Sequence, residues 1–278
     1  ITRAVPDGTG GYKIVNEYDD STLVLFRLCG DGSIGEVCDL HKHEGKGGLK
    51  VRGQMCSHLH SVNFDPSGQW VLVCDKGCDR IYVYRMNREK GILEPSPRTV
   101  VHTRPGTAPR HLEFHPYAPY CFVNHETASA VTSYYFDAGT GTLREADYQP
   151  MIPMDPSVKA ELIGDTYGSP ADIHVHPGGQ FLYSSQRSSY HTGQGTDCIA
   201  VFRIDPENGR LERTSIAVME GPCPRGFAIE PDGRFLYVGN QYLDTICRYR
   251  IDPVTGGLTD RQTVAHAATP TCIRIVDI

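Results

Sequence analysis

A seven-residue phrase recurs four times and decides the fold: His60-Ser-Val-Asn-Phe-Asp-Pro66, Arg110-His-Leu-Glu-Phe-His-Pro116, Ala171-Asp-Ile-His-Val-His-Pro177 and Arg225-Gly-Phe-Ala-Ile-Glu-Pro231. The closing prolines are separated by 50, 61 and 54 residues. A period near 50 residues indicates a repeat architecture and must be recognised before any local assignment.

Each phrase is followed by two runs rich in β-branched and aromatic residues, with turns that contain Gly, Asp or Pro between them. The first runs cover residues 70–73, 120–123, 181–183 and 235–238, and the second runs cover 80–84, 131–135, 199–202 and 246–249. Such runs predict antiparallel strands joined by hairpins. With a short closing strand, each repeat holds four strands, which is typical of a β-propeller blade. A β-sandwich gives turns every 8–12 residues but no four-strand superperiod, so we expect an all-β propeller.

We expect one propeller domain over residues 1–278, with repeats at about 1–57, 58–108, 109–169, 170–222 and 223–268 and a final strand over 269–278. That final strand resembles the first strand of a blade and has no blade after it. A propeller ring closes when strands from both ends of the chain complete one blade. The sequence therefore predicts either another mode of closure or about two blades missing before Ile1.

Composition excludes several classes of protein. The 278 residues are 39% hydrophobic and 22% charged, with a formal net charge of −6, which argues against a nucleic-acid partner. A run of about 18 apolar residues and a secretory signal are both missing, so we expect no membrane partner. Ten cysteines fall below the density of a disulfide-stapled secreted domain, and we expect a reducing, cytoplasmic setting.

Two positions of each repeat are expected to form rings around one mouth of the central channel, because the start of a first strand and the end of a second lie at the same end of their hairpin. The first ring holds His60, Arg110, Ala171 and Arg225, and the second holds Lys76, Glu126, Arg187 and Gln241. The repeats agree elsewhere and diverge here, which favours a functional pocket. Rim residues of a protein-binding propeller remain an alternative.

These side chains suit an anionic substrate. Arginines bind carboxylate or phosphate groups bidentately and stabilise an oxyanion, while Glu126 or His60 can activate water. No cofactor is expected, because neither a dinucleotide fingerprint nor a serine-hydrolase elbow occurs. Cys74 and Cys78 lack a second pair, and three His-x-His pairs lack carboxylates in a recognisable motif, so we expect no metal site.

Several phrases resemble the seven-bladed propeller lactonases, a family that includes bacterial 6-phosphogluconolactonase and fungal carboxy-cis,cis-muconate cyclase. They include His58-Leu-His-Ser-Val-Asn-Phe-Asp-Pro-Ser-Gly68, Pro109-Arg-His-Leu-Glu-Phe-His-Pro116 and Ser184-Ser-Gln-Arg187. The resemblance implies a metal-independent site whose catalytic residues fall on His60, Arg110, Glu126 and Arg187. The ring positions add Arg225, Lys76 and Gln241 as substrate-binding candidates. Five repeats are visible here, whereas the family has seven blades.

The leading hypothesis is a lactone hydrolase that acts on an anionic sugar lactone, with 6-phosphogluconolactone as the expected substrate. The first alternative is a muconate-type cycloisomerase, in which the same arginines bind carboxylates. The second is a non-catalytic propeller that binds a ligand or protein at the mouth. The small-molecule partner expected from the sequence is thus an anionic lactone or carboxylate, and the oligomeric state is left open.

Overall fold

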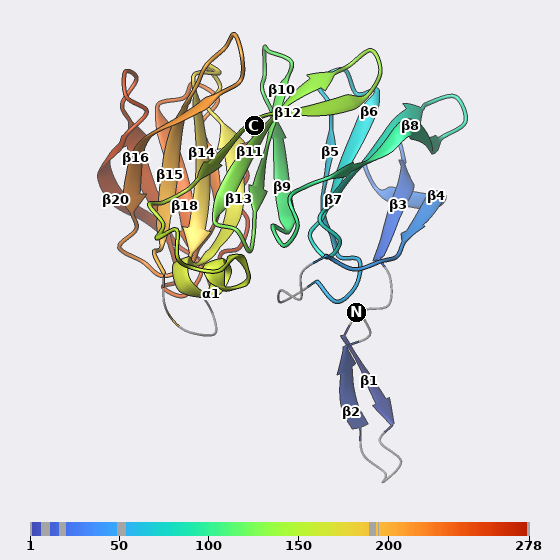
Figure 1. Cartoon of the computed structure of the whole chain (residues 1–278), viewed down its shortest axis with the longest axis horizontal. Coiled ribbons are helices and arrows are strands. Elements are labelled where there is room, and N and C mark those ends of the chain that lie inside the picture. The colour runs from blue at the N-terminus through green and yellow to red at the C-terminus, as the bar shows by residue number, and fades with distance from the viewer. Residues whose placement is uncertain are drawn as a thin grey trace.

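The protein is built from antiparallel blades that stand side by side in an arc (Figure 1). The computed structural model describes residues 2–6, 12–16, 21–48, 54–188, 193 and 195–276. Within these residues four sheets have four strands each, hydrogen-bonded in sequence order. This confirms the prediction of an all-β fold made of propeller blades.

The blades are numbered along the chain. Blade 1 consists of β5 (Leu59–Phe64), β6 (Trp70–Asp75), β7 (Arg80–Asn87) and β8 (Ile92–His102). Blade 2 consists of β9 (Pro109–Phe114), β10 (Tyr120–His125), β11 (Ala130–Asp137) and β12 (Thr142–Pro150). Blade 3 consists of β13 (Ser169–Val175), β14 (Phe181–Arg187), β15 (Cys198–Ile204) and β16 (Leu211–Val218). Blade 4 consists of β17 (Pro224–Ile229), β18 (Phe235–Asn240), β19 (Thr245–Ile251) and β20 (Leu258–His266).

Helical structure is confined, in the described chain, to the connection between blades 2 and 3. A 3₁₀ turn, η1 (Ala160–Leu162), leads into the five-residue helix α1 (Ile163–Tyr167). Neither is long and apolar enough to cross a membrane.

The first expected repeat, residues 1–57, differs from a blade. It contains two separate hairpins, one of β1 (Thr2–Pro6) and β2 (Tyr12–Asn16), the other of β3 (Ser21–Leu28) and β4 (Ile34–His43). The β3–β4 hairpin packs on blade 1 through Leu23, whereas β1–β2 projects away from the blades (Figure 1). Residues 1, 7–11, 17–20 and 49–53 of this repeat lie outside the described part.

The expected final strand over 269–278 carries no strand pairing in its described part, which ends at residue 276. It nevertheless lies against blade 4, because a Cβ added to Gly226 of β17 would lie 2.7 Å from the Thr271 carbonyl oxygen. Ile273 and Ile275 continue along the blade and line a hollow with Tyr237. The segment thus packs against blade 4 without forming a strand ladder.

Consecutive blades share one kind of corner, in which an aromatic ring at the start of a second strand packs under a glycine of the next blade's closing turn. A Cβ on the glycine would lie within 2.4–2.6 Å of the ring in the pairs Trp70–Gly141, Tyr120–Gly209 and Phe181–Gly256. Gly141 also has a φ of +67°, which disfavours side chains. These contacts explain why the closing turns require glycine and help to fix the blades relative to one another.

The histidines that precede Pro116 and Pro177 tie neighbouring blades together. The imidazole Nε2 of His115 lies 2.9 Å from the Gly179 carbonyl oxygen, and that of His176 lies 3.0 Å from the Gly233 carbonyl oxygen. Their Nδ1 atoms accept backbone N–H groups of their own turns. These two histidines are therefore structural.

Candidate active site

A β-bulge occurs at the first ring position of all four blades. In β9, Arg110 and His111 together oppose the single residue Asn124, since Val123 pairs with Leu112 and His125 with Pro109. The registers of β5, β13 and β17 shift at the equivalent place, beside His60, Ala171 and Arg225. A bulge bends its strand and re-aims side chains, and bulges are common beside active sites. The ring residues are therefore presented by a local irregularity that the blades share.

Three ring residues from two blades form one ionic cluster. The Nζ of Lys76 lies 3.0 Å from both carboxylate oxygens of Glu126, and the Nε of Arg110 donates to Glu126 Oε2 at 3.0 Å. The Arg110 side chain is 3% exposed, against 15% for Lys76 and 21% for Glu126. The structure thus brings together residues that lie up to 50 positions apart in the sequence.

The charges of this cluster are strongly coupled. Burial alone would raise the pKa of Glu126, but Lys76, Arg110 and Arg187 outweigh it and hold the pKa well below its usual range. Burial, together with the Arg187 charge, lowers the pKa of Arg110 to about 10. Burial also lowers the pKa of Lys76, against the pull of Glu126. Glu126 is consequently a fixed anion and a weak base.

His60 stands beside the cluster as a neutral imidazole. Burial, followed by the positive charge of Arg110, lowers its pKa to about 2. Its Nδ1 is buried and has no hydrogen-bond partner among the described residues. Its ring lies 5.1 Å, between centroids, from that of His111. The site therefore holds an unprotonated histidine whose ring nitrogen is uncommitted.

The remaining predicted residues differ in how near they lie to the cluster. Arg187, 3% exposed, donates to the carbonyl oxygens of Ser169 and Pro170 at 3.3 Å and acts electrostatically on Glu126. The positive charge of Arg225 contributes to the lowered pKa of Arg110. Gln241 contacts Cys223, whose Sγ lies 3.3 Å from the Gln241 Oε1.

Three residues that sequence reasoning missed extend the cluster. His111 lies between Arg110 and Asp172, with its Nε2 3.0 Å from Arg110 Nη1 and its Nδ1 2.9 Å from Asp172 Oδ1. His174 lies 3.3 Å from Asp172 Oδ2 and 3.7 Å from Glu113. A polar residue follows the ring position in blades 2 and 3, but strand alternation places it on the opposite face unless the bulge is known.

The residues one position before the second ring point into the blades instead. Asp75, His125, Gln186 and Asn240 are at most 2% exposed. Asp75 shows their role, since it accepts hydrogen bonds from the Ser57 hydroxyl and the His58 and Gly77 N–H groups. A shift of one residue thus separates loop anchors from the charged mouth.

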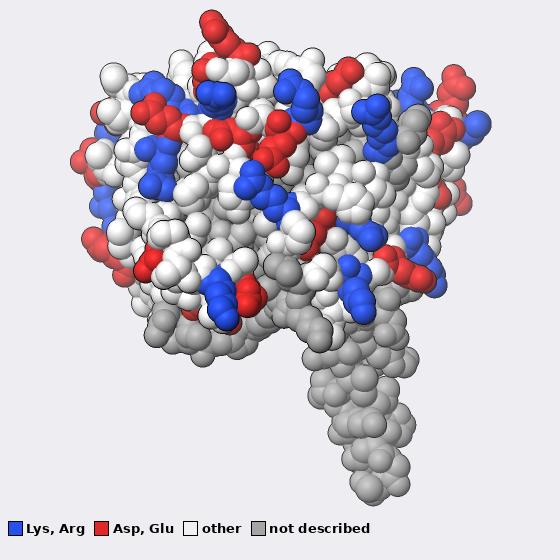
Figure 2. All heavy atoms as spheres, in the orientation of Figure 1, with Lys and Arg blue, Asp and Glu red and all other residues white. Residues whose placement is uncertain are grey.

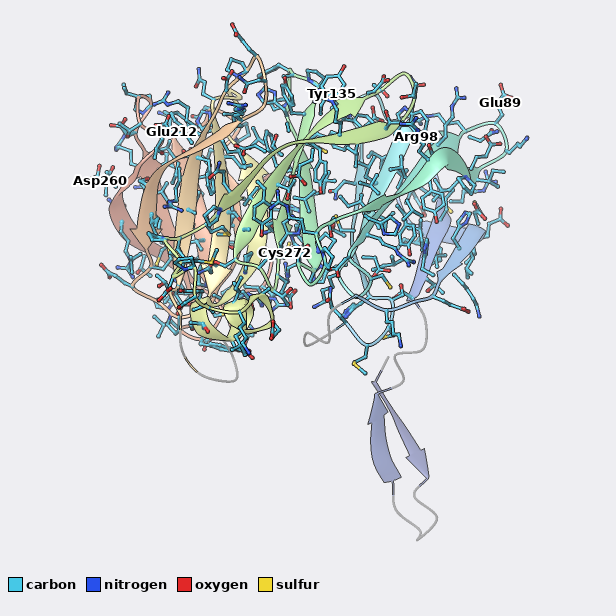
Figure 3. The ribbon with its side chains drawn as sticks, viewed as in Figure 1. Glu89, Arg98, Tyr135, Glu212, Asp260 and Cys272 are labelled. Atoms are coloured by element: carbon cyan, nitrogen blue, oxygen red, sulfur yellow. The ribbon has the colours of Figure 1, made fainter. Side chains whose placement is uncertain are left out.

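Charged side chains also cover the outer surface. Acidic and basic side chains are intermixed over the face shown in Figure 2. Exposed charges such as Glu89 and Asp260 point outward from the edges of blades (Figure 3). In the part of the chain that the structure describes, no group of three or more His, Cys, Asp or Glu residues is placed to hold a metal ion.

Comparison with known proteins places this arrangement in a family. The family model described as "Lactonase, 7-bladed beta-propeller" matches residues 5–275. The chain belongs to this family. Its described residues contain four four-stranded blades, and the whole chain spans about two thirds to three quarters of the length of its first curated relatives.

Relatives of this propeller lactonase include enzymes named for one substrate. It is 31% identical over 253 residues to a 6-phosphogluconolactonase of Formosa agariphila, which covers 91% of this chain and 67% of that protein. It is 28% identical over 270 residues to the 6-phosphogluconolactonase of Bacillus subtilis, covering 97% and 71%. The structure of a periplasmic gluconolactonase of Pseudomonas aeruginosa matches with a TM-score of 0.79 and 27% identity, covering 92% of this chain and 66% of that one.

Proposed function

We propose that this propeller lactonase hydrolyses the lactone ring of an anionic sugar lactone, 6-phosphogluconolactone, at the mouth formed by its ring residues. The observation that carries the proposal is the buried Lys76–Glu126–Arg110 cluster with neutral His60 beside it. Its curated relatives named 6-phosphogluconolactonase support the choice of substrate. The reaction consumes water and yields the open-chain acid, so the protein must supply charge stabilisation and proton transfer.

His60 is the base in this mechanism, and Glu126 is the counter-ion. Both oxygens of Glu126 already accept hydrogen bonds from Lys76 or Arg110, which leaves it little basicity. Arg110 and Lys76 contribute to the low pKa of His60. An anionic substrate that offsets these cations raises the pKa of His60 and makes it a better base when substrate is bound.

The chemical steps follow from these roles. His60 takes one proton from water while the hydroxide adds to the lactone carbonyl carbon, and Arg110 stabilises the oxyanion that forms. The bond between the carbonyl carbon and the ring oxygen then breaks, and His60 returns the proton to the departing ring oxygen. Lys76, Arg187 and Arg225 hold the phosphate as fixed cations. Gln241, the residue directly after β18, is a further substrate-binding candidate.

The test compares the purified protein on 6-phosphogluconolactone, gluconolactone and a carboxymuconate, with spontaneous lactone opening as the baseline. We expect hydrolysis of the phosphorylated lactone, and a drop of at least about tenfold in kcat/KM for both Glu126→Gln and Arg187→Ala. Glu94→Gln is the matched control, because Glu94 is an outer carboxylate paired with Asn87 and Lys90. Wild-type rates in both mouth variants, with folding confirmed by circular dichroism, would overturn the assignment. Turnover of the carboxymuconate alone would establish the cycloisomerase instead.

We also propose a cytoplasmic location. None of the ten cysteines forms a disulfide in the structure, and seven of them are buried, as a reducing compartment permits. Disulfide mapping of protein isolated under non-reducing conditions tests this, and a native intramolecular disulfide would contradict it.

A further inference from the structure

His111 has one tautomer that fits its two contacts. A guanidinium can only donate, so the contact of 3.0 Å with Arg110 Nη1 requires His111 Nε2 to accept. The proton must then sit on Nδ1, which donates to Asp172 Oδ1 at 2.9 Å. Arg110 and Asp172 together therefore select the neutral, Nδ1-protonated imidazole.

Asp172 is itself held in place by a residue of its own strand and by a residue of the next blade. Its Oδ2 lies 3.3 Å from His174 Nε2 on its own strand, β13, and accepts the backbone N–H of Phe227 on β17 at 3.2 Å. Its side chain is 13% exposed. The carboxylate thus bridges the innermost strands of blades 2, 3 and 4 and gives His111 a rigid anchor.

The contacts of Arg110 with the protein use its Nε and Nη1 atoms and leave Nη2 available. Its Nε donates to Glu126, and its Nη1 donates both to His111 and to the Ala171 carbonyl oxygen. No hydrogen bond joins Nη2 to any described residue. Three partners on three sides therefore orient the planar group so that only the Nη2 edge is available to a ligand.

We infer that His111 and Asp172 are positioning residues that aim the Nη2 edge of Arg110 at the reacting carbonyl. The inference deepens the proposed lactonase function and rests on it. Without His111, Glu126 and the Ala171 carbonyl oxygen still bind the guanidinium, but the second N–H of Nη1 has no acceptor and the group is held less firmly. A displacement of about 1 Å in such a group costs up to about a hundredfold in rate.

The arrangement also predicts an acid limit to activity. A protonated His111 would present an N–H to the N–H of Arg110, which breaks the contact and adds like-charge repulsion. The groups that face His111 are Arg110 on its own strand, Asp172 and His174 on β13 and His60 on β5. Burial, ahead of the opposing hydrogen bond to Asp172, lowers the pKa of His111, so the contact survives at neutral pH.

The test compares His111→Phe, which fills the space without an acceptor, with His111→Gln, which can accept from Arg110 and donate to Asp172. We expect His111→Phe to lower kcat about ten- to a hundredfold with a smaller change in KM, and His111→Gln to recover part of that loss. We also expect the acid limb of the kcat/KM profile to move in His111→Gln. His266→Phe, at an exposed position at the end of the outer strand β20, is the control and should keep kcat within about threefold.

A second measurement does not depend on turnover. Nitrogen NMR of wild-type protein with labelled histidine should show His111 as the neutral Nδ1–H tautomer at pH 7, and Asp172→Asn should mix the two tautomers. Wild-type kcat and pH profile in His111→Phe, or an Nε2–H tautomer in the wild type, would overturn the inference. If the wild type opens no lactone while the tautomer is as expected, the proposed function has failed, and binding of 6-phosphogluconate by His111→Phe and wild type then decides the inference. Equal affinities would overturn it.

Discussion

The corners between blades and the mouth of the channel follow opposite rules. Three successive corners repeat one solution, an aromatic ring under a glycine. At the mouth, equivalent positions hold His60, Arg110, Ala171 and Arg225 on equivalent bulges. The same pair of residue types packs well at every corner because the backbones of neighbouring blades meet in the same way. A binding site, in contrast, needs different chemical groups around one ligand. Divergence within a repeat is therefore a guide to function.

The largest effect is expected from breaking a corner. Gly141→Ala should lower the free energy of unfolding by roughly 3 kcal/mol, through a positive φ and a Cβ that meets the Trp70 ring. Gly91 is the matched control, because its φ is also positive, at +65°, but a Cβ there meets nothing within 4 Å. Gly91→Ala should cost only about 1 kcal/mol. Urea denaturation measures both losses, and equal losses would show that the Trp70 ring moves aside for the added methyl group at little cost.

A smaller effect is expected from His174, whose contribution to the free energy of unfolding should depend on pH. Asp172 and Glu113 overcome the burial of His174 and raise its pKa to about 10. The stabilisation is complete below the pKa of an unfolded histidine, about 6.5, and is lost as pH rises through 10. The pKa of Asp172 is lowered, despite its burial, mainly by hydrogen bonds from His111 and His174, so the same contact also fails in acid.

We therefore expect His174→Gln to be destabilised relative to wild type by about 2 kcal/mol near pH 5–6, with the difference shrinking toward pH 10. The Gly141→Ala penalty should not change over this range, because no titratable contact is involved. Denaturation series at several pH values test this. A His174→Gln penalty independent of pH would contradict the ionic contact.

The smallest effect is expected from a single corner hydrogen bond. The Tyr120 hydroxyl donates to the Glu207 carbonyl oxygen at 2.8 Å, so Tyr120→Phe should cost about 1 kcal/mol and leave kcat/KM unchanged. The Tyr183 hydroxyl makes the same kind of bond to Gly256, also at 2.8 Å, and Tyr183→Phe should cost a similar amount. Tyr117→Phe at an exposed position is the control. Unequal losses at Tyr120 and Tyr183 would show that these contacts are not interchangeable.

The sequence predicted the blades and much of the cluster, because both follow from a period that can be counted. Lys76, Arg110 and Glu126 meet as the ring positions require. His111 and Asp172 could not be found in the same way, since simple alternation turns them away from the mouth and only the bulge returns them. The described strands of the first repeat form two separate sheets and not one, because turn signals predict hairpins but not whether two hairpins join.

Ala171, the one apolar residue of the first ring, takes part in the site through its backbone. It is fully buried, and its carbonyl oxygen accepts Nη1 of Arg110 from the preceding blade. Blade 3 thus contributes a backbone acceptor at the ring position where its neighbours contribute charged side chains. The acceptor is a main-chain atom, so a substitution at position 171 keeps the carbonyl group. The link between blades 2 and 3 at this point therefore depends on the path of the backbone and on Arg110, and not on the side chain of residue 171.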